Sequence, residues 1–329
     1  MTAHLAVVYG GPSAEAAVSK VSADAVFRAL QGLGYQCSLL ELTANLAEEL
    51  VRARVDAVVP ATHGAMGEDG CLQGLLEVLG VPYSGSAVLA SALAAHKGMA
   101  KRVFSDAGLP VARGREVSRA TWMESMAGAL RAELGGAVVV KPCSGGSAIG
   151  IGRIAETDPD ERLNEALEAA FEVDPQVVVE CFRKGDEVTC GVLEDEAGVA
   201  VALPPTRILS KAADWYDFTS RYGTGGSEHQ CPPPYAPALI ARIQEVAVGA
   251  HRALGARDLS RVDFVVLPEA GEITLLEVNT LPGMTPTSLF PEAAGVFGVD
   301  FATLCGRLAR RALARSQERH KPSVRSMPA

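Results

Sequence analysis

Residues 261–289 read RVDFVVLPEAGEITLLEVNTLPGMTPTSL, and this stretch decides the fold. Two apolar runs, 261–267 and 273–279, flank a Glu-Ala-Gly turn and therefore predict an antiparallel hairpin. The hairpin runs directly into the loop NTLPGMTPTSL, which is rich in backbone donors and hydroxyl groups. A loop of this composition suits the binding of a carboxylate.

The hairpin carries a set of oxygen donors at strand spacing. Alternate residues of a strand point to the same face, so Asp263, Glu277 and Asn279 are expected to converge with Arg261 beside them. Three such oxygens, completed by phosphate oxygens and water, match what Mg²⁺ requires. A solvated polar face is the alternative interpretation. The apolar residues between the donors and the loop that follows favour the metal site.

A second signal is a lysine at the end of an expected strand, 137–141. Lys141 is followed by the Gly/Ser-rich loop 144–147. A lysine supplies charge and such a loop supplies N–H groups, which together suit a polyphosphate. The loop lies between two strands, unlike a P-loop, and so predicts a flexible flap. Taken alone, a Gly/Ser loop is more often only a turn.

A third signal is VVVECFRKGDE, residues 177–187. Glu180 and the backbone of Cys181 and Phe182 can form a hinge for adenine, and Glu187 can accept a ribose hydroxyl. Taken alone, Glu180 would be a surface carboxylate at the end of a strand.

The first third of the chain alternates strands and helices. Apolar runs predict strands at 5–9, 35–40 and 57–61, and helical spacing of apolar residues begins at Val18. This order predicts an α/β unit with a doubly wound parallel sheet.

Later segments complete the expected elements. One helix is expected from about Ser91 to 108, and another over 159–171. Residues 204–234 lack clear periodicity and predict an active-site lid. A helix begins near Pro237.

Composition excludes several classes of protein. The chain has 329 residues, 48% hydrophobic and 21% charged, which excludes a largely disordered chain. The net charge of −9 disfavours partnership with nucleic acid or an anionic membrane. The N-terminus has no signal-peptide pattern, and the longest apolar stretch, 87–95, is too short to span a bilayer. Seven cysteines without a CxxC pair predict reduced thiols in the cytoplasm.

These residues, in this order, resemble the ATP-grasp superfamily and, within it, the D-alanine–D-alanine ligase family. The resemblance covers roughly residues 5–314. Its matching blocks are GGPSAEAAVS (10–19), HGAMGEDGCLQGLLEVLGVPYSGS (63–86), SALAAHK (91–97), KPCSGGSAIG (141–150), VVECFRKGDEVT (179–189), WYDFTSRY (215–222) and the hairpin with its loop.

The resemblance implies an ATP-grasp fold of mixed α/β and α+β character, with the doubly wound domain at its N-terminus. The expected divisions are an N-terminal substrate-binding domain at 1–96, a central subdomain at 97–186, a C-terminal subdomain with the metal site at 187–316, and a flexible tail at 317–329. It also implies a homodimer. ATP would lie between the central and C-terminal subdomains, and the substrates would meet where all three parts converge.

The activity implied is the joining of two D-alanines with ATP, through an acylphosphate, to give D-alanyl-D-alanine for peptidoglycan synthesis. By similarity, Lys97 and Lys141 bind phosphates, Ser147 lies in the flap over the transferring group, and Arg221 belongs to the ATP site. Asp263, Glu277 and Asn279 would hold two Mg²⁺ (or Mn²⁺) ions.

The resemblance also assigns the amino-acid sites. Glu15 would bind the ammonium of the first D-alanine, with His63 near its carboxylate and Val18 beside it. Arg261 would orient the acylphosphate, and the N–H of Gly283 would bind the oxyanion. Ser288 and the backbone of Leu289 would bind the carboxylate of the second D-alanine. The lid residue Tyr222 would form a hydrogen-bonded triad with Glu15 and Ser147. A tyrosine at this lid position favours an amine nucleophile and therefore a peptide bond.

The sequence departs from the family pattern mainly in the flap and lid. Ala16 replaces an Arg, Ala148 a Ser, Arg221 a Lys and Thr219 an acidic residue. His96 also stands where Asp is usual. Drift among homologues is one explanation. A specialised ligase of a biosynthetic or self-resistance pathway, with a different acceptor, is the alternative. A non-catalytic nucleotide-binding module is disfavoured because the metal ligands and lysines are all present.

Overall fold

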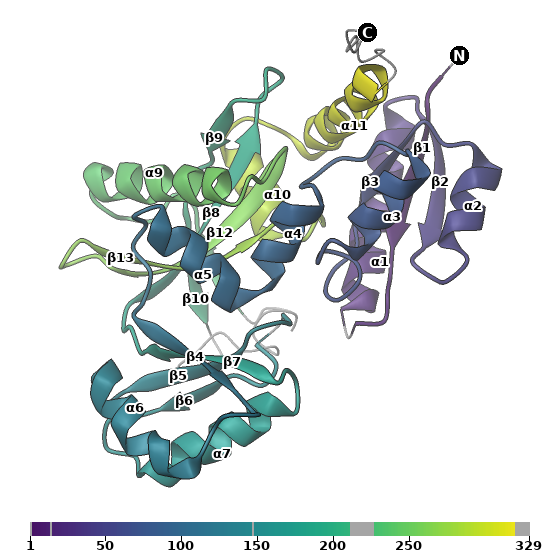
Figure 1. Ribbon diagram of the computed structural model, residues 1–329. Coiled ribbons are helices and arrows are strands. Elements are labelled where there is room, and N and C mark those ends of the chain that lie inside the picture. Colours follow the sequence, from purple (N-terminus) through teal and green to yellow (C-terminus); the bar gives the residue numbers. More distant parts are fainter. Residues whose placement is uncertain (1, 14, 147, 211–226, 320–329) are drawn as a thin grey trace, which may run out of the picture.

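The computed structural model describes residues 2–13, 15–146, 148–210 and 227–319 (Figure 1). Within these residues no single helix is long and apolar enough to cross a membrane, although α10 (Leu289–Val296) and Phe301–Arg315 pass that test together as a pair bent by 104°.

The N-terminal unit is a parallel sheet of strand order β2-β1-β3, as the sequence predicts. Its elements are β1 (His4–Tyr9), α1 (Ala16–Gly32), β2 (Gln36–Glu41), α2 (Leu46–Ala53), β3 (Ala57–Pro60) and α3 (Cys71–Leu79). Leu5 and Val7 of β1 pack in one core cluster with α1 residues, while Ala6 and Val8 pack in another with residues of α2 and α3. Both faces of the sheet are therefore covered, and the doubly wound prediction is confirmed.

The central unit is an antiparallel sheet of order β4-β7-β5-β6. Its elements are β4 (Gly114–Ser118), the 3-10 helix η1 (Glu124–Met126), α6 (Ala127–Leu134), β5 (Val138–Pro142), β6 (Gly152–Ile154), α7 (Asp160–Phe171) and β7 (Gln176–Cys181). Val138 and Val140 pack with residues of α6 and α7 in one core. Because side chains alternate along a strand, Lys141 of β5 faces the opposite side of the sheet.

The C-terminal unit is a larger antiparallel sheet of order β11-β10-β8-β12-β13, with β9 paired to β8. Its elements are β8 (Asp186–Glu194), β9 (Ala200–Ala202), β10 (Thr206–Ser210), β11 (Ser227–Gln230), α9 (Pro237–Ala253), β12 (Leu259–Leu267), β13 (Glu272–Asn279), α10 and α11 (Phe301–Arg319). Helix α9 covers one face, where apolar residues of β8, β12 and β13 are buried, and α5 lies beside it (Figure 1). Polar residues of the hairpin occupy the other face.

The hydrophobic cores connect two of these units and leave the third apart. Leu5 of the N-terminal sheet shares a cluster with Phe290 of α10 and Leu304 of α11. In Figure 1, α11 correspondingly lies between the N-terminal and C-terminal sheets. The central unit has a core made only of its own residues, 117–181.

Three expectations need correction. The single helix expected over about 91–108 is two helices, α4 (Val88–Ala95) and α5 (Lys97–Asp106), because His96 adopts an extended conformation between them. The lid segment expected to lack regular structure contributes β10 and β11, which pair with each other. Helix α11 continues through Arg319, into the segment expected to be a tail.

Candidate active site

The hairpin brings the predicted oxygen donors together. In the register of β12 and β13, Asp263 lies directly opposite Glu277, and Arg261 lies opposite Asn279. A β-bulge follows Asp263, so Phe264 pairs with Leu275 and Leu276 is the extra residue. The expected strict alternation of β13 is thus interrupted: Leu275 and Val278 are buried, and Leu276 is only half-buried.

Arg261 holds Asp263 in a fixed orientation. Its Nε and Nη2 donate to the two carboxylate oxygens at 2.9 and 2.8 Å. Thr189 of the neighbouring strand β8 donates a third hydrogen bond, at 2.8 Å, to Oδ1 of Asp263. A carboxylate oriented in this way keeps lone pairs for a cation on the open side.

Lys97 links the hairpin to the loop after β5. It is the first residue of α5, and its Nζ donates to the carbonyl oxygen of Gly145 at 2.6 Å. The same Nζ lies 3.7 Å from Oε2 of Glu277. The Lys97 ammonium group therefore lies between the loop expected to form the flap and the oxygen donors of the hairpin.

Lys141 projects from the face of β5 opposite the central core, where its Nζ donates to Oε2 of Glu180 at 3.0 Å. Lys101 of α5 binds the other oxygen of Glu180, also at 3.0 Å. Burial alone would raise the pKa of Glu180, but the charges of Lys141 and Lys101 hold it below its usual value. Glu180 is therefore an ionised carboxylate that positions two lysines.

The expected adenine hinge is partly engaged in the protein's own hydrogen bonds. The N–H groups of Cys181 and Phe182 donate to the carbonyl oxygens of Arg113 and Ala137, both at 2.9 Å. These two donors are therefore not available to a base. Glu187 lies on β8, opposite Val265 of β12.

Glu15 reaches from the N-terminal unit toward the flap. A Cβ atom added at Gly146 would lie 3.3 Å from Oε2 of Glu15, and one added at Gly64 would lie 2.8 Å from the same oxygen. Gly64 also has φ of +73°, which L side chains rarely adopt. Glycine at both positions leaves room for this carboxylate.

His63 is buried behind the site, against α1. Its Nε2 lies 3.4 Å from Oγ of Ser22, and this Oγ accepts a hydrogen bond from the N–H of Met284. Burial lowers the pKa of His63, against the opposing charge of Glu15. The imidazole is therefore neutral near pH 7.

The loop after β13 carries a group of hydrogen-bonded polar side chains. Oγ of Ser288 accepts from the N–H of Thr285 and lies 2.7 Å from its hydroxyl oxygen. A Cβ added at Gly283 would lie 3.0 Å from the same Oγ. Ser288 is the residue before α10, whose first residue is Leu289, so the positive end of the helix dipole points toward Ser288.

Val18, expected beside the first substrate, is half-buried on α1.

Three predicted residues lie outside the described part of the chain. These are Ser147, Arg221 and Tyr222, and the same is true of the departure Thr219.

Several residues near the site were not assigned a role from the sequence. Thr189 is the last residue of the matching block 179–189, and it lies two residues after Glu187 on the same strand, so alternation places both on one face. Lys101 follows Lys97 by one helical turn, which also was visible. Ser22 carried no signal in the sequence.

Glu68 is the most unusual of the unassigned residues. The residue is half-buried, its Oε1 accepts from the N–H of Gly64 at 3.0 Å, and its buried Oε2 has no hydrogen-bond partner among the described residues. Burial, together with the charge of Glu15, raises the pKa of Glu68 to about 8. It belongs to the GEDG block, but only the folded structure shows its proximity to Glu15.

The donor set fits a hard divalent cation. Asp263, Glu277 and Asn279 offer carboxylate and amide oxygens from one hairpin, the ligands that Mg²⁺ and Mn²⁺ accept. Oδ1 of Asn279 is oriented by a hydrogen bond from the N–H of Leu281 at 2.9 Å.

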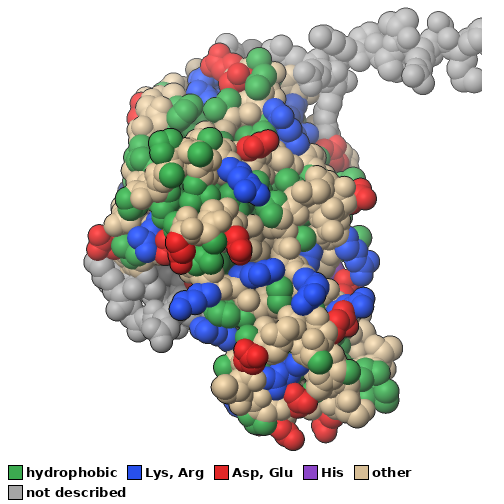
Figure 2. All heavy atoms as spheres, turned by 90° about the vertical axis from the view of Figure 1, so that its left-hand side faces the viewer, with side chains coloured by type: hydrophobic (Ala, Val, Ile, Leu, Met, Phe, Trp, Pro, Cys, Tyr) green, Lys and Arg blue, Asp and Glu red, His purple; other side chains and the backbone are tan. Residues whose placement is uncertain are grey.

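Lysine and arginine side chains gather where the upper and lower parts of the molecule meet, on the face shown in Figure 2.

Comparison with known proteins identifies a consistent set of relatives. The family described as D-ala D-ala ligase N-terminus matches residues 41–86, and that described as D-ala D-ala ligase C-terminus matches residues 103–310. The D-alanine–D-alanine ligase of Geobacter sulfurreducens is 43% identical over 308 residues, which is 93% of each chain.

Solved structures agree with these relatives. The crystal structure of D-alanine–D-alanine ligase from Bacillus anthracis complexed with ATP has a TM-score of 0.81 at 29% identity, covering 97% of this chain and all of that one. The VanG D-Ala:D-Ser ligase from Enterococcus faecalis has a TM-score of 0.80 at 29% identity, covering 95% of this chain and all of its own.

Proposed function

The chain belongs to the D-alanine–D-alanine ligase family, and we propose that it joins two D-alanines into D-alanyl-D-alanine through an acylphosphate formed with ATP. The single observation that carries this proposal is the convergence of three parts of the chain. Nζ of Lys97 contacts both the carbonyl oxygen of Gly145, in the loop after β5, and the carboxylate of Glu277. The carboxylate of Glu15, from the N-terminal unit, lies beside Gly146 of the same loop.

The first step needs an activated carboxylate. A carboxylate is a poor electrophile at neutral pH, and transfer of the γ-phosphoryl group gives it a good leaving group. In this proposal Lys97 and Lys141 neutralise the phosphates, and their support is that Lys97 lies between Gly145 and Glu277 while Glu180 positions Lys141. Arg261, oriented by Asp263, would place its positive charge beside the acylphosphate.

The metal ions belong to the same step. Asp263, Glu277 and Asn279 would hold two Mg²⁺ or Mn²⁺ ions, which would supply charge neutralisation at the bridging phosphate oxygens when bound.

The first D-alanine would be held by its charged groups. Glu15 accepts its ammonium, and the neutral imidazole of His63 lies beside it and supports the same subsite. Holding the ammonium at Glu15 would restrict the orientation of the substrate, so that its carboxylate can be turned toward the phosphoryl donor.

The second D-alanine would enter at the loop before α10. Ser288 and the backbone at Leu289 would bind its carboxylate, because the helix N-terminus offers N–H groups and a positive dipole. The N–H of Gly283 would stabilise the oxyanion as the amine attacks. That amine must first lose a proton, and Tyr222 and Ser147 belong to this part of the proposal by family resemblance.

The cellular role follows from the product. D-Alanyl-D-alanine is a building block of peptidoglycan, so we place the reaction in the cytoplasm, where ATP is available. The homodimer implied by the resemblance is part of the same proposal.

A second candidate is a ligase with the same first substrate and a different acceptor. It is favoured by one specific observation: the departures from the family pattern, Ala148, Thr219 and Arg221, lie in the flap and lid. Arg is not equivalent to Lys, because it offers a planar fork in place of a compact charge. The VanG D-Ala:D-Ser ligase is a structural relative with such an activity in its name.

The deciding experiment is phosphate release with ATP and Mg²⁺, using D-Ala, D-Ser, D-lactate and L-Ala singly and in pairs, with product masses measured. Turnover with D-Ala alone, giving the dipeptide, supports the first proposal. Turnover only with a mixed pair supports the second. ATP binding without turnover on every pair contradicts both and leaves a non-catalytic nucleotide-binding module.

A further inference from the structure

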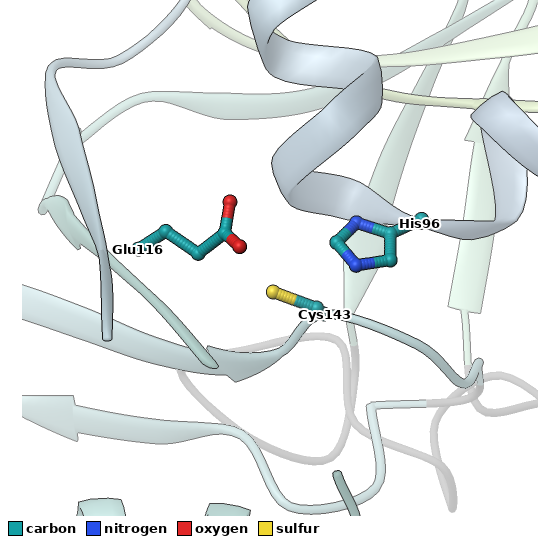
Figure 3. Close-up of side chains that lie close together, drawn as sticks. All are labelled: His96, Glu116 and Cys143. Atoms are coloured by element: carbon teal, nitrogen blue, oxygen red, sulfur yellow. The ribbon is translucent and has the colours of Figure 1, made fainter. Parts of the chain in front are cut away.

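Three side chains that the proposed reaction does not use converge at the root of the flap. They are His96 from the break between α4 and α5, Glu116 from β4, and Cys143 directly after β5 (Figure 3). Their ligand atoms all lie within 4.8 Å of one another. Figure 3 shows the three side chains directed toward a common space from three different elements.

The chemistry of this cluster differs from that of the hairpin. Thiolate, imidazole and carboxylate together are ligands for a borderline-soft cation such as Zn²⁺, whereas Mg²⁺ prefers oxygen alone. Three protein ligands also leave a fourth tetrahedral position for water. We propose that His96, Glu116 and Cys143 form a Zn²⁺ site, separate from the oxygen-donor site of the hairpin.

Cys143 would have to lose its thiol proton to bind a cation. The residue has no exposed surface, and burial raises the pKa of its thiol to about 12, with the charges of Glu116 and Asp174 acting in the same direction. Lys97 and the N–H of Gly98 act in the opposite direction, at the start of α5. The free thiol is therefore protonated, and binding of the cation releases that proton.

Gly98 lies beside the space between the ligands, where a side chain would not fit. A Cβ added at Gly98 would lie 2.6 Å from Oε2 of Glu116 and 3.3 Å from Cε1 of His96. Any side chain at this position would separate the carboxylate from the imidazole. Gly98 therefore permits the three ligands to approach.

Two existing interactions must yield when the cation binds. Nδ1 of His96 accepts a hydrogen bond from the N–H of Met99 at 3.2 Å, and either ring nitrogen can become a ligand only when this bond is released. Arg102 pairs with Oε2 of Glu116 at 2.7 Å, but the Arg102 side chain is 65% exposed. Exposed pairs of this kind contribute little to stability, so Glu116 can exchange its partner.

Hydrogen bonds connect the proposed Zn²⁺ site to Lys97, the residue proposed to bind phosphate. The N–H of Lys97 donates to the carbonyl oxygen of Cys143 at 2.7 Å, and Nζ of Lys97 binds the carbonyl oxygen of Gly145. Zn²⁺ would fix α5, β4 and the root of the flap to one another. We therefore expect bound Zn²⁺ to change the KM for ATP.

The test uses Co²⁺ as a spectroscopic probe of the full-length, metal-free protein. The expected result is one equivalent of Co²⁺ with a near-ultraviolet thiolate charge-transfer band, which Zn²⁺ abolishes by competition and excess Mg²⁺ does not. The band should disappear in Cys143→Ser, and the Co²⁺ affinity should fall at least about tenfold in Glu116→Gln, whose exposed position on the edge strand β4 favours normal folding.

Two control variants separate this site from the others. Cys71→Ser removes an exposed thiol next to Asp69, and Glu277→Gln alters the hairpin site; both should retain the band. Absence of the band from the wild type, or its loss in Cys71→Ser or Glu277→Gln, would overturn the proposal. Because the readout is metal binding, it is independent of whether the protein ligates D-alanine.

The link to ATP has its own readout. In saturating Mg²⁺, Zn²⁺ should change the KM for ATP of the wild type and leave that of His96→Ala unchanged. An equal response in both proteins would overturn the coupling, since Zn²⁺ would then act elsewhere.

Discussion

Asp258 accepts two hydrogen bonds from Arg315, at 2.6 and 2.8 Å, and thereby ties α11 to the residue that precedes β12. Arg311 donates a third at 2.9 Å, and the N–H of Gly85 a fourth at 2.7 Å. Burial would raise the pKa of Asp258, but the hydrogen bonds and charge of Arg315 hold it below its usual value. One ionised carboxylate therefore joins the N-terminal unit, the hairpin of β12 and β13, and the last helix.

We expect Arg315→Ala to destabilise the protein by about 3–5 kcal/mol, because it leaves a buried carboxylate short of its partner. The matched control is Arg310→Ala on the same helix. Arg310 pairs with Glu196 at the surface, where both side chains are more than half exposed, so its loss should cost less than about 1 kcal/mol. Urea unfolding of the two variants measures both values, and equal costs would contradict this role for Asp258.

Glu68 predicts a pH dependence of stability. Its pKa is raised by burial from an ordinary 4.5 to about 8, so the folded state binds a proton that the unfolded state has lost between these values. Stability should therefore fall as pH rises from about 4.5 to about 8, and it should be fully reduced above 8.

Glu68→Gln removes this titration and keeps an oxygen for the N–H of Gly64. The difference in Tm between the variant and the wild type should grow in favour of the variant from pH 5 to pH 8.5. A difference that stays constant across this range would show that Glu68 does not titrate there.

The hairpin donors predict a loss of activity without a loss of structure. Glu277→Ala should reduce ADP formation by at least about 10²-fold, the scale on which single groups stabilise a charged transition state. Glu272→Ala, at the exposed far end of the same strand, should retain turnover. Wild-type turnover by folded Glu277→Ala, with circular dichroism unchanged, would refute the metal assignment.

Gly64 predicts a substrate effect that depends on space. In Gly64→Ala, the new Cβ would approach Oε2 of Glu15 and Oγ of Ser13 to within 3 Å, and the backbone conformation would be strained. The KM for the first D-alanine should rise by at least about tenfold, since Glu15 must move. Gly74→Ala in α3, where nothing lies within 4 Å of the new atom, should leave KM unchanged and stabilise the helix by about 0.5–1 kcal/mol.

Local patterns predicted the hairpin, the doubly wound sheet and the oxygen donors, because strand alternation places side chains without reference to distant residues. The bulge after Asp263 broke this alternation, and only the pairing with β12 reveals it. His96 divides a helix whose apolar spacing is continuous. The raised pKa of Glu68 depends on burial and on the charge of Glu15, which lies near it only in the folded chain, so no local pattern could predict it.

The cores have a consequence for opening of the molecule. The N-terminal and C-terminal sheets share one hydrophobic core, which includes Leu5 and Phe290, whereas the hydrophobic core of the central unit contains only its own residues. Amide hydrogen exchange should therefore report two cooperative units, with α7 exchanging independently of α1 and α11. A movement of the central unit alone would therefore leave intact the contacts of Ser22 with His63 and with the N–H of Met284.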